Sequence, residues 1–104
     1  MEFLMREGLK KADFVPYLSQ KFDVHIEGFS PVEVELAEII DRSTNYMESF
    51  SLFFRGTKDR VFRQNTYRMT HPEMGEFSLF LGPVTMKKTD GVYYEAVFSR
   101  LTSN

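Results

Sequence analysis

The stretches ESFSLFFRG at residues 48–56 and GEFSLFLGP at residues 75–83 share a Phe-Ser-Leu-Phe core, and this pair decides the fold. Each copy is apolar on both faces over most of its length, and each ends at a glycine, Gly56 or Gly82. A strand of this kind must be covered on two sides. The pair therefore predicts two central strands of a closed or sandwiched β-structure that share one aromatic core.

An internal duplication would also write the same strand twice. The residues that flank the two copies do not match, however, which favours two strands of one core that meet the same packing demand. We therefore expect one β-rich domain over residues 1–104, with residues 1–8 as a candidate flexible arm.

Composition limits the function classes. The chain has 104 residues with 42% hydrophobic and 15% aromatic content, which suits a globular domain rich in strands. The absence of cysteine excludes disulfides and thiolate metal sites, and it fits the cytoplasm. No apolar run approaches the ~20 residues that a membrane helix needs, and no secretion signal begins the chain. A net charge of −2 argues against a nucleic-acid partner.

Periodicity places one short helix before about six strands. Residues 9–18 suggest one or two helical turns, which Pro16 limits. Period-two alternation then marks strands over 21–27, 32–40, 66–70 and 92–101, with a bulge expected at 37–40. Residues 72–75 predict a turn with a left-handed glycine, and Asp90-Gly91 predicts a hairpin. The expected fold is a compact antiparallel barrel or sandwich.

Few residues could carry catalysis. His25 lies between Asp23 and Glu27 on a polar strand face, and His71 precedes a proline at a turn, where its ring can bond the backbone. We interpret both histidines as surface or structural groups. No nucleophile elbow, phosphate loop or metal motif occurs, so we expect no enzyme activity and no cofactor. A hydrolase would require a cleft that joins either histidine to a serine or a second carboxylate.

Charge is segregated along the chain, with acids dominating residues 27–48 and bases dominating residues 55–68. Such asymmetry can steer a protein partner or join copies of the chain. The alternative is that the two stretches neutralise each other across neighbouring strands. The partner-binding hypothesis rests on Arg55, Lys58, Arg60, Phe62, Arg63 and Arg68, although Phe62 could instead pin its loop to the core.

The segments LKKADFVPYLSQKFDV, FSLFFRG, QNTYRMTHPEMGEFSLFLGPV and YYEAVF resemble a small bacterial domain family of unknown function. The resemblance runs from Leu9 to Phe98 and implies a β-rich fold without catalytic residues. Family members have glycine where Asn65 stands and near Ser19-Gln20, so we expect a left-handed turn at Asn65. The family's neighbourhood of phage-tail-collar-like proteins implies an accessory role in a tail, fibre or injection apparatus.

These observations predict a structural or interaction domain, with an accessory or chaperone-like role, that binds a protein through its strand edges, the basic loop, or both. It would act in the cytoplasm or on an assembled phage-like particle. The alternative is a small-ligand barrel, which requires the inward rings to line a cavity instead of filling it, namely those of Phe22, Phe50, Phe54, Phe77 and Phe98.

Overall fold

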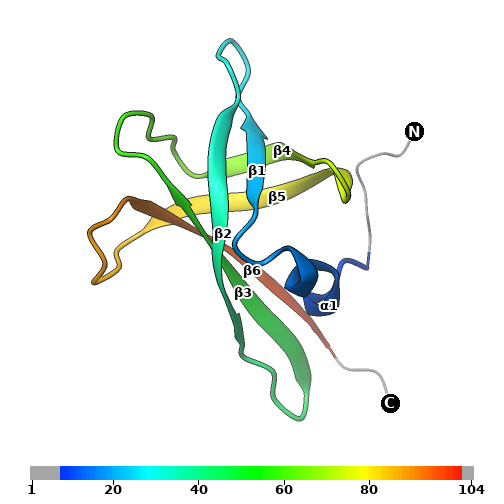
Figure 1. Ribbon diagram of the computed structural model, residues 1–104. Helices are drawn as coiled ribbons and strands as arrows, with labels where there is room; N and C mark the ends of the chain where they lie inside the picture. The colour runs from blue at the N-terminus through cyan, green and yellow to red at the C-terminus, as the bar shows by residue number, and fades with distance from the viewer. Residues whose placement is uncertain (1–7, 102–104) are drawn as a thin grey trace.

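A computed structural model describes residues 8–101, so most of the candidate arm at residues 1–8 lies outside the described residues. Six antiparallel strands form a closed barrel in the order β1-β2-β3-β6-β5-β4 (Figure 1). The mainly β fold with one short N-terminal helix is confirmed, and of the two expected architectures the chain forms the barrel. The elements are α1 (Lys11–Phe14), a 3-10 turn (Val15–Tyr17), β1 (Lys21–His25), β2 (Val32–Asp41), β3 (Met47–Gly56), β4 (Asn65–His71), β5 (Gly75–Val84) and β6 (Val92–Leu101).

The twice-written strand forms β3 and β5, which flank β6 from opposite sides. β3 is buried on both faces as expected: Phe54 points into the core, and Phe53 is buried opposite Glu38 and Glu95 on the outer face. The two-sided burial expected for β5 is wrong, because Phe80 is 57% exposed. β3 pairs with a neighbour along both edges, whereas β5 pairs with β6 only over residues 82–84. Side chains that could cover the outer face of β5 are therefore missing there.

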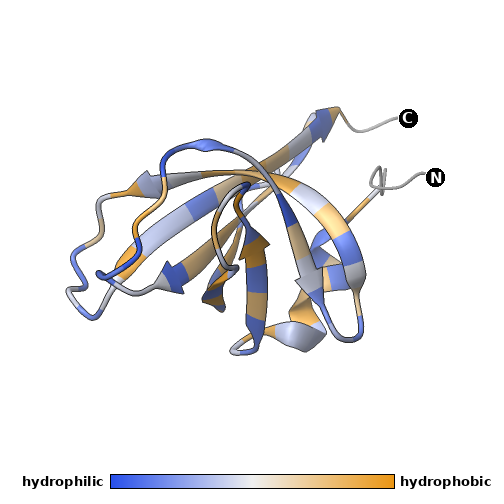
Figure 2. Cartoon of the chain, turned by 90° about the horizontal axis from the view of Figure 1, so that it is seen from above, coloured by the Kyte–Doolittle hydropathy of each residue, from blue (hydrophilic) through white to orange (hydrophobic). Residues whose placement is uncertain are grey.

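Aromatic rings fill the barrel interior. The ring of Phe22 lies 5.5 Å from that of Phe54 and 6.2 Å from that of Phe77, both edge-on, and Phe50 stacks on Phe98 at 4.5 Å. Phe14 of α1 closes the barrel end, with its ring 5.9 Å from Phe77. Figure 2 shows the alternation of hydrophobic and hydrophilic residues along the strands that directs these rings inward.

The backbone at several connections matches the sequence pattern. The register of β2 against β3 shifts between Leu36 and Glu38, which confirms the expected bulge. Gly75 has a φ of 80° at the end of the turn that joins β4 to β5. Residues 85–91 connect β5 to β6, so Asp90-Gly91 ends a longer loop and does not form a two-residue turn.

Two departures from the related family have different outcomes. Ser19 has a φ of 72°, a left-handed conformation that favours glycine, at the exit from the 3-10 turn. The left-handed turn expected at Asn65 is wrong, since this residue begins β4 with a negative φ. Its Oδ1 accepts a hydrogen bond from the backbone N–H of Thr66 at 2.8 Å, which explains a polar residue at the strand start.

Candidate protein-docking groove

The structure separates the six residues of the partner-binding hypothesis. Arg55 lies in β3 and forms ion pairs with Glu35 of β2 and Asp90 of the β5–β6 loop. The Tyr93 hydroxyl and the Arg55 guanidinium both hold the pKa of Asp90 below its usual value. Arg68 lies in β4 and is paired with Glu76 at 3.3 Å. The Arg55–Glu35 pair joins the basic and acidic stretches, as the neutralisation alternative expects. The partner of Arg68, Glu76, lies outside the acidic stretch at residues 27–48.

Arg60 ties the 57–64 loop to the turn between β1 and β2. Its guanidinium donates hydrogen bonds to the backbone carbonyls of Ser30 at 2.6 Å and Pro31 at 3.0 Å. A planar guanidinium that holds two carbonyls fixes both segments in one relative position. This contact makes the two segments into the walls of one groove.

Phe62 packs the same loop against the core of the barrel. Its ring stacks on the buried ring of Tyr94 with the centroids 3.9 Å apart, and it meets Tyr67 edge-on at 5.0 Å. The backbone N–H of Phe62 donates to the Tyr94 hydroxyl at 3.3 Å, and burial raises the pKa of that hydroxyl. Phe62 therefore pins the loop to the core and forms one wall of the groove.

The groove itself has a volume of about 680 Å³ and lies between the β1–β2 turn and the loop. Two apolar side chains stand exposed on it, Phe29 at 72% and Val61 at 58%. Arg63 also lines it, and no carboxylate among the described residues forms an ion pair with the Arg63 guanidinium. Sequence reasoning missed Phe29, for which the available signal was a large aromatic residue inside a Gly-Phe-Ser-Pro turn.

Three of the six predicted residues meet in this groove: Arg60, Phe62 and Arg63. Lys58 belongs to the same loop but lines a different hollow, beside Arg55. The structure thus divides the predicted basic cluster into a groove-lining half and a half that faces elsewhere. Lys58 becomes the natural control for any test of the groove.

The two histidines have different structural roles. His25 lines the groove, and its Nε2 lies 2.9 Å from the Thr70 hydroxyl oxygen. His71 is buried, and its Nδ1 accepts hydrogen bonds from the backbone N–H groups of Glu73 at 3.0 Å and Met74 at 3.3 Å. Within residues 8–101 no cluster of three potential metal ligands occurs. The turn role predicted for the His71 ring is confirmed.

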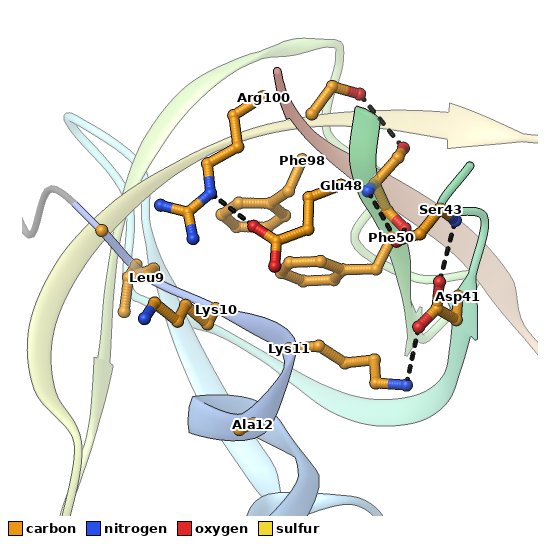
Figure 3. Close-up of a pocket in the computed structure, with 13 residues that line it drawn as sticks. Leu9, Lys10, Lys11, Ala12, Asp41, Ser43, Glu48, Phe50, Phe98 and Arg100 are labelled. Atoms are coloured by element: carbon orange, nitrogen blue, oxygen red, sulfur yellow. Dashed lines mark hydrogen bonds and ion pairs between the residues drawn. The ribbon is translucent and has the colours of Figure 1, made fainter. Parts of the chain in front are cut away.

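A second hollow of about 320 Å³ lies between α1 and the adjoining ends of β3 and β6 (Figure 3). The stacked rings of Phe50 and Phe98 form its apolar part. Charged groups at its rim pair with one another: Lys11 with Asp41 at 3.0 Å and Arg100 with Glu48 at 2.6 Å.

Asp41, which lines this hollow, makes the stability of the fold depend on pH. The backbone N–H of Ser43 and the Lys11 ammonium lower the pKa of Asp41 from 3.8 to about 2. A lowered pKa contributes stability that is present above pH 3.8 and lost as the pH falls through about 2. We expect the stability difference between the wild type and Asp41→Asn to shrink across this window. Urea unfolding at several pH values measures it.

A control for this expectation measures the pKa of the Asp41 carboxyl directly. Lys11→Met should raise the pKa of Asp41 in a carbon-detected NMR titration, whereas Lys58→Met should leave it unchanged. An Asp41 that titrates at its ordinary value in the wild type would contradict the assignment.

The chain is a small antiparallel β-barrel domain, and two exposed apolar side chains, Phe29 and Val61, line a groove on its surface. Among the described residues, no helix has the length and apolarity that a membrane span requires. The chain belongs to the family described as a domain of unknown function (DUF6916), whose model matches residues 9–98. Searches of curated proteins and of solved structures gave no match.

Proposed function

We propose that this domain is a non-enzymatic interaction module that binds a protein partner in the groove between the β1–β2 turn and the 57–64 loop. The observation that carries the proposal is the Arg60 contact, which fixes two exposed apolar side chains, Phe29 and Val61, on one groove. Exposed apolar side chains cost little to desolvate, and rigid walls lower the entropy lost on binding. Both properties suit a docking surface.

The chemistry of the groove also suggests what the partner presents. Glu27 and Asp59 line the groove together with Arg60 and Arg63, but among the described residues neither carboxylate forms an ion pair with Arg63. A partner segment with an apolar side chain next to a carboxylate would complement Arg63 and the exposed apolar pair. We infer that this is the segment the groove selects.

The barrel interior supports this proposal over a small-ligand barrel. A ligand barrel needs space between the inward rings, but the ring of Phe22 packs edge-on against those of both Phe54 and Phe77. Close-packed interiors leave no room for a ligand. The exposed groove is therefore the better candidate for binding.

The resemblance to a family with tail-collar-like neighbours suggests where to look for the partner. We propose an accessory or chaperone-like role toward a protein of a phage tail or injection apparatus. Such a role would place the domain in the cytoplasm or on an assembled particle.

The groove is tested by Val61→Asp combined with Arg63→Glu, which leaves the Arg60 contact intact. Both side chains are exposed, so the fold should be retained while affinity for the partner falls at least ~10-fold through loss of apolar contact and reversal of charge. Affinity capture from the native host with mass spectrometry identifies the partner. Binding to the purified partner then gives the affinity.

Lys58→Glu is the matched control, because it reverses an exposed charge in the same loop outside the groove. It should bind like the wild type. Equal binding by all three proteins, or equal loss in both variants, would reject the groove as the docking site.

A further inference from the structure

The barrel wall opens between β5 and β6. Their pairing covers only Gly82–Val84 of β5 and Tyr93–Glu95 of β6. Beyond this point β6 continues against β3 as far as Leu101, while β5 continues against β4, and the two strands separate on the side of α1 (Figure 1). Within residues 8–101 no strand pairs with the second edge of β6 over residues 96–101.

This free edge carries two exposed apolar residues on its outer face. Val97 is 61% exposed and Leu101 is 75% exposed, and Ser99 lies between them on the same outer face. Leu101 is directly opposite Met47 of β3, which extends the apolar strip. A strand edge that has no neighbouring strand and carries exposed apolar side chains is a template for another strand.

We propose that a second copy of this chain pairs with the edge, β6 against β6, antiparallel and centred on Ser99. A two-fold axis makes such an interface self-complementary, so each residue pairs with a position reflected through the centre. With Ser99 opposite itself, Val97 of each copy meets Leu101 of the other. The two exposed apolar residues thereby cover each other.

The neighbouring registers are less favourable. Centring on Arg100 places two guanidinium groups directly opposite each other, and like charges at opposed positions destabilise a strand pair. Centring on Phe98 sets Leu101 against Glu95 and leaves Val97 opposite Ser99. Of the three, only the Ser99 register pairs apolar with apolar and opposes no like charges.

The inner face accepts the same register. Phe98 would lie opposite Arg100 of the second copy, a guanidinium beside an aromatic ring. The hollow between α1 and β6 offers space at this place, with Phe98 and Arg100 among the residues that line it (Figure 3). The hollow beside α1 and the free edge of β6 are thus two sides of one interface.

The absence of native cysteine makes a direct test simple. In the proposed dimer Ser99→Cys sets the only thiol of each copy against its twin, at an effective concentration in the mM range. Under oxidised glutathione, the folded variant should form a disulfide-linked dimer at least ~10-fold faster than Thr57→Cys, an exposed control on a distant loop. Light scattering should give twice the mass of one chain for the wild type.

Two further variants fix the register. Val97→Cys alone should cross-link slowly, because it faces Leu101 of the other copy, whereas Val97→Cys with Leu101→Cys should cross-link fast. Val97→Lys, at an exposed position, should give a folded monomer that still binds the groove partner. A wild type that stays monomeric at hundreds of micromolar, or Ser99→Cys no faster than Thr57→Cys, overturns the proposal. Faster cross-linking by Val97→Cys than by Ser99→Cys overturns its register.

Discussion

Replacing Phe77 with alanine is expected to lower the free energy of unfolding by about 3–5 kcal/mol, while Phe80→Ala should change it by less than about 0.5 kcal/mol. Both residues belong to the same Phe-Ser-Leu-Phe stretch of β5. Phe77 is fully buried against Phe14 and Phe22, so its removal leaves a cavity at the centre of the barrel. Phe80 faces outward beside the opening. Urea unfolding of both variants measures the difference.

β3 supplies the control for this expectation, because Phe50 and Phe53 hold the matching positions and both are buried. Alanine at either of these positions should be costly, unlike alanine at Phe80. Comparable losses for Phe77→Ala and Phe80→Ala would show that the outer face of β5 is covered in solution. That result would contradict the inference that the barrel wall is open between β5 and β6.

Replacing His71 with alanine is expected to lower the free energy of unfolding by about 2–3 kcal/mol, because two backbone donors lose their acceptor at the β4–β5 turn. The Nε2 atom also lies 2.8 Å from the Gln20 Oε1, and the ring packs on Phe22 at 4.7 Å. His25→Ala should cost less than about 1 kcal/mol, since the His25 side chain is partly exposed and, within residues 8–101, forms one hydrogen bond, to the Thr70 hydroxyl. Thermal and urea unfolding provide the measurement.

His71→Asn separates the hydrogen bonds from the packing. An asparagine Oδ1 can take the place of Nδ1 as the acceptor, so this variant should recover part of the loss. If asparagine is no better than alanine, the turn hydrogen bonds do not account for the role of His71.

Local patterns sufficed for the strands and most turns. Alternation at Tyr67 and Met69 marked β4, and the irregular step after Leu36 marked the bulge, because a strand displays its two faces in its own residues. The exposure of Phe80 was not predictable in this way. It depends on how far β6 accompanies β5, and the residues of β5 do not encode that distance.

The residues of the candidate groove were also only partly predictable from local sequence patterns. Clustering of charge in the chain suggested one basic surface, but Arg55 and Arg68 are paired across the barrel wall while Arg63 reaches the groove. Phe29 joins this groove from a turn far away in sequence, because Arg60 holds its neighbours Ser30 and Pro31. Contacts between segments distant in sequence carry no local signal.

Composition and periodicity are properties of the chain, and they were enough to predict a small, cysteine-free, antiparallel β domain with an aromatic core and a short helix. Tertiary structure alone decided that the six strands close into a barrel, that the wall opens beside β6, and that Phe29 and Val61 share a groove. The physical reason is that closure, opening and grooves depend on the register and length of pairing between strands, which the whole set of packing contacts fixes together.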